Sequence, residues 1–168
     1  MTNAFFEKPI LNSPYDQPVR HWELDDAGQP TQQIVAARRR AEFITPIPKP
    51  RKQTGGRQDE LLFDELSSQQ QSYHSGIING VRAEVDRWRA LPNPADWRVT
   101  PETARLLQHW RSHEFAGIRP FFCQVEAAET AIWLTEVAPQ TKNGKFLLEH
   151  LASANKDANP ELMRLALK

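Results

Sequence analysis

The sequence predicts a mainly α fold of the α+β class, with about four helices, a small N-terminal β-hairpin and one strand at the C-terminal end. Apolar residues recur at helical spacing through most of residues 76–168. Two short apolar segments near the N-terminus flank a turn-forming sequence. Residues 45–75 are rich in Pro, Gly and Gln, which is typical of a linker. We therefore divide the chain into a mixed segment 1–44, a basic-then-acidic linker 45–75 and a helical region 76–168.

The mixed segment is expected to contain the hairpin. Residues 19–24 and 31–36 are plausible strands, and the Asp25-Asp26-Ala27-Gly28 sequence between them has the composition of a turn. Trp22 falls in the first strand, where a large aromatic side chain most often packs against a core. In residues 45–52 proline alternates with other residues, which favours an extended backbone after the hairpin.

The helical region should hold four helices, because its apolar residues recur every three or four positions. The first ends near Leu91, since the prolines that follow stop its propagation. Thr100-Pro101-Glu102 opens the second with a Thr cap, a Pro at the first helical position and an acid in the first turn. The four apolar stripes are Ile77, Val81, Val85 and Trp88; Leu106, Leu107 and Trp110; Phe121, Val125, Ala128 and Ile132; and Phe146, Leu147 and Leu151.

The third helix is expected to begin near Arg119-Pro120 and to run to about Val137, and the fourth to cover residues 146–155. Asn159-Pro160 then breaks the helical pattern. Residues 162–167 are predicted to form a strand.

The composition limits the classes of function. The net charge is +0, so any contact with nucleic acid must be local. The single cysteine, Cys123, excludes an internal disulfide or a Cys-rich zinc site, and its two Phe neighbours predict that it is buried. No window holds the roughly 18 consecutive apolar residues of a membrane span. The N-terminus lacks the pattern of a secretory signal, so we expect a cytoplasmic protein without a membrane partner.

One stretch of the chain is strongly basic. Residues 38–57 contain seven Lys or Arg against one acid, Glu42, and could neutralise phosphates with salt-dependent affinity. A solvated linker is the alternative, and the acidic residues in 59–65 could pair with the basic ones. The candidate nucleic-acid contacts are Arg38, Arg39, Arg40, Arg51 and Lys52.

The histidines do not predict a metal site. His109 and His113 are four positions apart on one predicted helix, a spacing that can bind zinc, but no third ligand is identified. The sequence also contains no Gly-rich phosphate loop and no evident Ser-His-Asp arrangement. No catalytic residue is therefore predicted within this chain.

Gln124, near the start of the third predicted helix, can offer both an acceptor and a donor to the edge of an adenine. Arg119 precedes it by five positions and could fix the loop or stack on the base. A solvated Gln on a helix surface is the alternative interpretation.

Taken together, several segments resemble the N-terminal region of the restriction subunit of type III restriction enzymes and of related DEAD/DEAH-type helicases. The resemblance covers nearly the whole chain and implies that Gln124 is the adenine-facing Gln of that family and Arg119 the Arg before it. The matching sequences are FEKPILNSPY at 6–15, HWEL at 21–24, FITPIP at 43–48, TPETARLL at 100–107, RPFFCQVEAA at 119–128, Trp133 and LALK at 165–168.

Members of that family are ATP-driven DNA translocases and endonucleases that use ATP and Mg²⁺. In type III systems proper they act with a modification methyltransferase subunit. The resemblance implies that residues 162–167 open a RecA-like parallel sheet and that a Thr-Gly-x-Gly-Lys-Thr loop would follow them.

This sequence lacks the loop, the magnesium-binding acids and the nuclease residues on which the family's chemistry depends. We therefore expect an N-terminal fragment that is inactive alone, binds neither ATP nor Mg²⁺ tightly, and works with DNA and the remainder of the helicase polypeptide. The alternative is a stand-alone helical module that binds nucleic acid or a partner protein.

Overall fold

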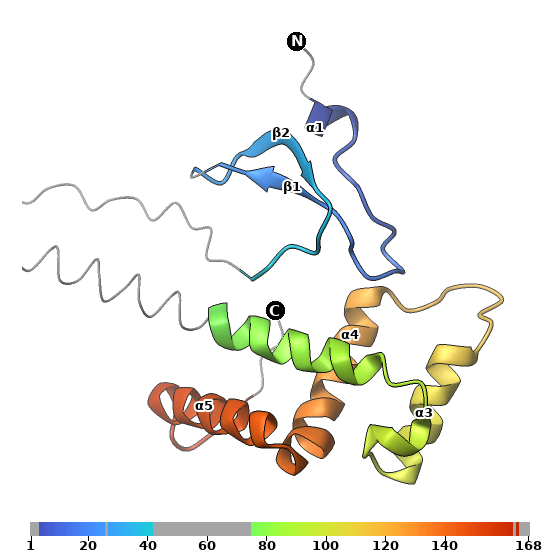
Figure 1. The fold of residues 1–168 in the computed structure, drawn as a ribbon, viewed down its shortest axis with the longest axis vertical. Coiled ribbons are helices and arrows are strands. Elements are labelled where there is room, and N and C mark those ends of the chain that lie inside the picture. The colour runs from blue at the N-terminus through green and yellow to red at the C-terminus, as the bar shows by residue number, and fades with distance from the viewer. Residues whose placement is uncertain (1–3, 26, 42–74, 163, 165–168) are drawn as a thin grey trace, which may run out of the picture. The chain divides into compact units, whose positions relative to one another are not determined.

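The computed structural model describes residues 4–25, 27–41, 75–162 and 164. It is mainly helical with a small antiparallel hairpin near the N-terminus, as the sequence predicts (Figure 1). The chain separates into two compact units, Met1–Asn79 and Gly80–Lys168, which are described in turn. The predicted linker lies outside the described residues except for Ser75.

The first unit is built around a two-stranded sheet. A single helical turn, α1 (Ala4–Glu7), precedes β1 (His21–Leu24) and β2 (Pro30–Val35). The strands are antiparallel, with Trp22 opposite Ile34. The hairpin prediction is confirmed, although β1 begins two residues later than predicted and β2 lies one residue earlier. The helical turn α1 was not predicted.

Asp25 organises the turn of the hairpin. Its Oδ1 accepts hydrogen bonds from the N–H groups of Ala27, at 3.0 Å, and Gln29, at 2.8 Å. Gly28 has a φ of 76°, a conformation that residues with a Cβ atom rarely adopt. The short acidic side chain and the glycine therefore reverse the chain where the sequence predicts a turn.

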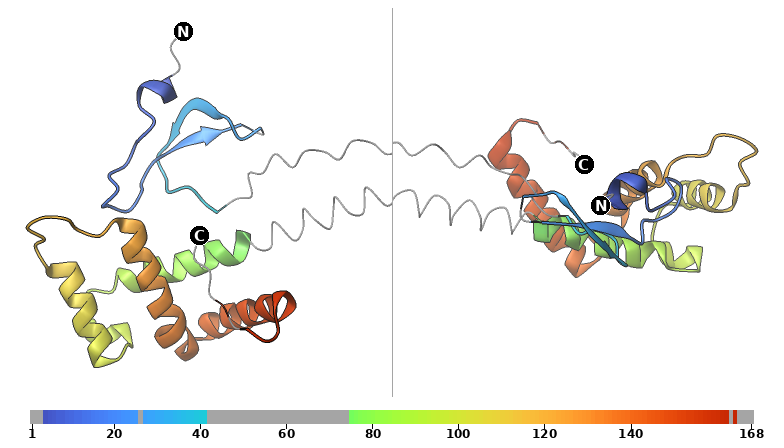
Figure 2. Two further views of the ribbon diagram at one scale, coloured as in Figure 1. Left: turned by 180° about the vertical axis from the view of Figure 1, so that it is seen from behind. Right: turned by 90° about the horizontal axis from the view of Figure 1, so that it is seen from above.

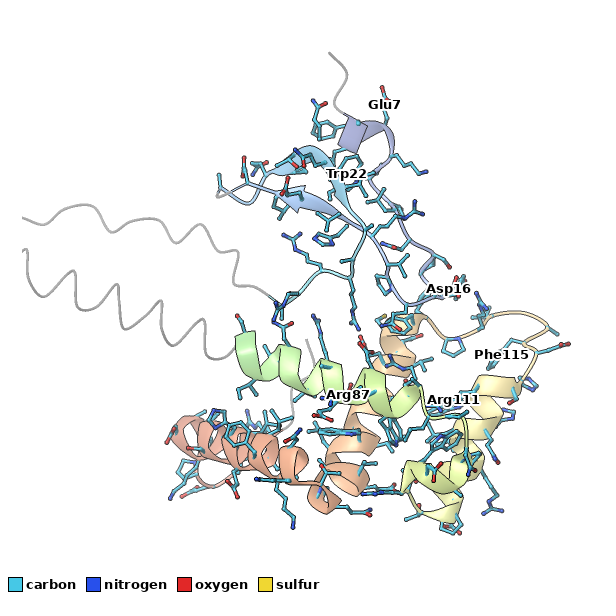
Figure 3. The ribbon with its side chains drawn as sticks, viewed as in Figure 1. Glu7, Asp16, Trp22, Arg87, Arg111 and Phe115 are labelled. Atoms are coloured by element: carbon cyan, nitrogen blue, oxygen red, sulfur yellow. The ribbon has the colours of Figure 1, made fainter. Side chains whose placement is uncertain are left out.

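Trp22 is the buried centre of the first unit (Figure 3). Its side chain is 8% exposed, and its ring meets the ring of Phe5 edge-on at 5.9 Å between centroids. The indole Nε1–H donates to the backbone oxygen of Lys8 at 3.2 Å, so the polar atom of the ring is satisfied. The prediction that this Trp packs in the core is confirmed.

The second unit contains the helices, of which α4 lies between α3 and α5 (Figures 1 and 2). The first of its helices covers residues 75–89 and so begins in the first unit. The others are the 3₁₀ helix η1 (Pro94–Trp97), α3 (Pro101–Ser112), α4 (Phe122–Ile132), the π-helical turn η2 (Trp133–Val137), the 3₁₀ turn η3 (Ala138–Gln140) and α5 (Lys142–Ala158).

The hydrophobic core of the second unit is rich in Trp and draws on each of these helical segments except α4, whose buried residue is Glu129. Leu107 of α3 is 0% exposed and Trp133 of η2 is 2% exposed. The other buried hydrophobic residues of the unit are Val81, Val85, Trp88, Trp97, Leu134, Val137, Ala138 and Leu147. The predicted stripes are thus confirmed in part, but Leu106, Phe121 and Phe146 of those stripes are exposed.

The residue just before each helix determines where that helix begins. Thr100 caps α3 as predicted, its Oγ1 accepting from the N–H of Thr103 at 3.3 Å. The prediction for α4 was three residues early, because the chain enters that helix in an extended conformation at Phe121. The prediction for α5 was four residues late, because Thr141 caps it by accepting from the N–H of Gly144 at 3.0 Å.

The predicted strand over 162–167 lies largely outside the described residues. Leu162 and Arg164 are described, and neither belongs to a strand. The side chain of Asn155 in α5 holds both, donating to the backbone oxygen of Leu162 at 3.1 Å and accepting from the N–H of Arg164 at 2.9 Å. Among the described helices, none combines the length and apolar character needed to cross a membrane.

Candidate functional site

The two predicted nucleotide-facing residues lie at the start of α4. Gln124 is the third residue of the helix and is exposed, and Arg119 is exposed in the segment that leads into it. The N–H of Phe121 donates to Oε1 of Gln124 at 2.9 Å, and the N–H of Gln124 donates to the oxygen of Phe121 at 3.0 Å. This reciprocal pair is the reason α4 begins at residue 122.

The bond from Phe121 fixes the orientation of the Gln124 side chain. Because a backbone N–H can only donate, the atom that faces it must be the amide oxygen of Gln124. The Nε2 amino group has no hydrogen-bond partner in the part of the chain that the structure describes. A second lone pair on Oε1 and two N–H donors on Nε2 are therefore available to another molecule.

The approach to α4 also exposes apolar surface. Ile118 is 99% exposed and Phe121 is 45% exposed. Cys123 is exposed as well, so the prediction that it is buried was wrong. It lies in the first turn of α4 on the side away from the core, whereas the buried residue of that helix is Glu129.

Glu129 is the buried charge of the second unit, at 1% exposure. Its Oε2 accepts from Nε of Arg89 at 2.5 Å, and its Oε1 accepts from Nη2 of Arg111 at 2.8 Å. The two arginines come from the 75–89 helix and from α3, so one carboxylate of α4 joins three helices. Asp86, at 2.6 Å from Arg89, and Glu126, at 3.7 Å from it, bring the cluster to three acids against two arginines.

Each of the two guanidinium groups lies against an aromatic ring. The Cζ atom of Arg111 lies 4.5 Å from the centroid of the Trp97 ring, and that of Arg89 lies 5.2 Å from the centroid of the Phe122 ring. Cation–π contacts of this kind strengthen where water is displaced. Since Arg89 touches Phe122 and also binds Glu129, the network anchors the first turn of α4, on which Gln124 stands.

Sequence reasoning missed the role of Glu129. The available signal was its place on the predicted apolar stripe, four positions after Val125 and three before Ile132, where an unpaired charge is not tolerated. Its partners could not be identified from spacing, because they lie 40 and 18 positions away in the chain.

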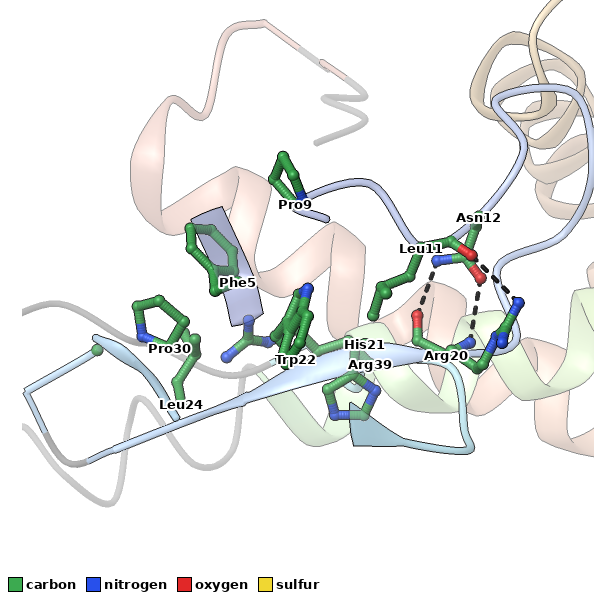
Figure 4. A pocket seen from close by; sticks show the side chains of 11 residues that line it. Phe5, Pro9, Leu11, Asn12, Arg20, His21, Trp22, Leu24, Pro30 and Arg39 are labelled. Carbon is green, nitrogen blue, oxygen red and sulfur yellow. Dashed lines mark hydrogen bonds between the residues drawn. The ribbon is translucent and has the colours of Figure 1, made fainter. Parts of the chain in front are cut away.

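The predicted nucleic-acid residues fall in the first unit or outside the described residues. Arg51 and Lys52 belong to the undescribed part, whereas Arg38, Arg39 and Arg40 follow β2. Arg39 lines a groove of about 420 Å³, together with Arg20, His21 and Trp22 (Figure 4). The structure thus brings one of the five predicted residues to a concave surface, which is also lined by Arg20, a residue that was not predicted.

His109 of α3 and His113, the residue that caps the end of α3, contact each other. The rings of His109 and His113 lie 4.6 Å apart, and His113 also meets Phe115 edge-on at 4.8 Å. Within the described ranges there is no group of three His, Cys, Asp or Glu that could hold a metal ion.

A second shallow pocket, of about 370 Å³, lies in the helical unit between Trp88 and Trp133. Arg98 lines it with a φ of 58°, a left-handed conformation that is uncommon for a residue other than Gly. The backbone oxygen of Arg98 accepts from Nε2 of Gln140 at 2.9 Å, which holds the residue in place.

Comparison of the chain with protein-family models, with curated proteins and with solved structures finds no match.

Proposed function

We propose that this chain is the N-terminal, nucleotide-facing region of an ATP-driven DNA translocase of the restriction-helicase type. The observation that carries the proposal is the exposed Gln124 amide, held by the Phe121 N–H in one orientation. In the proposed role Gln124 binds the edge of the adenine of ATP, and Arg119 supports the loop beside it.

The chemistry of the amide suits adenine. The N6 amino group of adenine donates and its N7 accepts, so a Gln side chain can bind both at once. Guanine carries acceptors at both O6 and N7 and cannot form the same pair of bonds. Because Gln124 is already oriented by the start of α4, little side-chain entropy is lost when the base binds.

The proposed role is recognition and not catalysis. The sequence has no Gly-rich loop for phosphates, so the chain does not supply phosphoryl transfer. In the complete enzyme the remaining polypeptide would hold the phosphates and Mg²⁺, and DNA and a modification methyltransferase subunit would be the partners. The proposal includes a cytoplasmic location, where ATP and DNA are both present.

Nuclear magnetic resonance of the isotopically labelled chain tests the proposal. Millimolar ATP or ADP should shift the side-chain amide signals of Gln124 and the backbone amide signals of residues 121–124, whereas GTP should leave them in place; the backbone signals also report on a variant without the Gln124 amide. Gln124→Glu keeps an oxygen for the Phe121 N–H but removes the donors, so it should abolish the preference for adenine.

Gln108→Glu is the matched control, because Gln108 is an exposed residue on α3. It should preserve the adenine-dependent shifts at Gln124. Equal shifts with ATP and GTP, or an adenine preference that survives Gln124→Glu, would contradict the proposal. Turnover of ATP above background by the purified chain would contradict the recognition-only role.

A further inference from the structure

We infer that the groove of the first unit binds single-stranded nucleic acid, with Arg20 and Arg39 as its phosphate-contacting residues (Figure 4). These residues lie in a different unit from Gln124, so the inference does not depend on the nucleotide-facing role.

The charged lining of the groove is positive. Both charged residues that line it, Arg20 and Arg39, are cations, and no described acid lines it. Arg39 is half-buried and forms no ion pair or hydrogen bond within the described part of the chain. Arg20 is exposed; its guanidinium donates to the backbone oxygen of Leu11 at 3.4 Å, and no described carboxylate pairs with it. A half-buried cation without an acidic partner, as Arg39 is among the described residues, favours an anionic ligand.

Hydrogen bonds hold the backbone at Arg20 and just before Arg39. Asn12 holds the backbone of Arg20 from both sides, since Oδ1 accepts from its N–H at 3.1 Å and Nδ2 donates to its oxygen at 2.8 Å. The Nδ1 atom of His21 lies 2.7 Å from the backbone oxygen of Ala37, which ties the segment before Arg39 to β1. Both cations therefore stand on anchored backbone, as a built site requires.

The groove that the two cations line is also partly apolar. Rings and aliphatic groups come from Phe5, Leu11, Trp22 and Leu24. Cations beside apolar and aromatic surface match a single strand, whose bases are free to pack. A duplex offers phosphates but keeps its bases stacked inside, so it cannot use that lining.

Fluorescence anisotropy of the full chain with labelled oligothymidylate tests the inference. Parallel titrations use a DNA duplex of equal length and polyglutamate. Arg20→Gln and Arg39→Gln should each weaken binding of the single strand roughly tenfold. Each should also lower the slope of log affinity against log salt by about 0.7, the value for one lost phosphate contact on a single strand. Arg39→Lys, which keeps the charge, should recover most of the affinity.

Arg105→Gln is the matched control, because it removes the same charge from an exposed position on α3, where the side chain is 76% exposed. It should bind like the unchanged chain. Equal affinity of the two groove variants and this control would overturn the inference. Equal or tighter binding of the duplex would also overturn it, and tighter binding of polyglutamate would assign the groove to an acidic protein segment instead. The groove variants should keep the adenine-dependent shifts at Gln124, which separates failure of this inference from failure of the proposed function.

Discussion

At the scale of single residues, Glu129 has the largest structural role in the helical unit. Its carboxylate is buried and binds arginines from two other helices, both of which pack against aromatic rings. A buried ion pair adds little net stability compared with well-packed apolar residues. Loss of one member is costly, however, because it leaves the opposite charge buried without a partner.

Glu129→Gln should lower the free energy of unfolding by about 3 kcal/mol, since it preserves the volume of the side chain but removes the charge that pairs with both arginines and leaves Arg111 without an acidic partner among the described residues. Urea unfolding followed by circular dichroism measures the change. Glu102→Gln is the control, because Glu102 is 75% exposed and lies 3.7 Å from Arg105. Its effect should stay within about 0.5 kcal/mol. Equal costs for the two substitutions would contradict a structural role for the buried cluster.

At the scale of elements, the start of α5 depends on a close approach between backbone segments. A Cβ atom added to Gly144 would lie 2.2 Å from the oxygen and 2.4 Å from the Cα atom of Ala138. Because these are backbone atoms, η3 and α5 can pack this closely only when residue 144 is Gly.

Gly144→Ala should therefore destabilise the chain by roughly 2 kcal/mol, the typical cost of overpacking a tight contact. Gly76→Ala is the matched substitution in the 75–89 helix, where an added Cβ meets no atom within 4 Å. It should stabilise the chain by about 0.5 kcal/mol, because Ala is the better helix former. Midpoints of urea unfolding compare the two, and a shift in the same direction for both would contradict the packing argument.

The same elements show what the sequence could predict. Thr100-Pro101 carries a complete local start signal, and α3 begins there. The start of α4 was predicted too early, because it depends on the bond between Phe121 and Gln124 and not on Arg119-Pro120. The start of α5 was predicted too late, because Gly144 disfavours a helix locally and is needed for a tertiary contact. A helix start with a complete local cap could thus be predicted from the sequence, whereas a start that depends on a specific packing contact or side-chain hydrogen bond could not.

The two candidate sites also differ in how far the sequence could predict them. Gln124 could be singled out because its neighbours in the chain mark a helix start. The groove could not be predicted, because it joins Arg20 and Arg39 across the hairpin, and only Arg39 belonged to a visible basic run.

At the scale of the whole molecule, the two units differ in how much they bury. In the described part of the first unit, Trp22 is the one buried hydrophobic residue, whereas the second unit buries the remaining ten. A two-stranded hairpin is marginally stable in water. The units should therefore differ in their local stability.

Native-state hydrogen exchange should show this difference. Amides of β1 and β2 should open with a much lower free energy than those at the centres of α3 and α4, because fewer apolar contacts must be broken. Trp22→Ala should lower protection in residues 4–41 and leave it unchanged in the α3 and α4 amides. Equal protection in both units would indicate one cooperative fold instead.

The π-helical turn at Trp133–Val137 has a consequence for how this chain can vary. A π turn accommodates one residue more than an α-helical turn, and here it leads directly into buried Val137 and Ala138. Deleting the exposed Thr135 would remove that extra residue and let the α-helix continue unbroken, with the side chains that follow keeping their orientation toward the core. Homologous sequences should therefore tolerate the loss of one residue at this turn more readily than elsewhere in the helix.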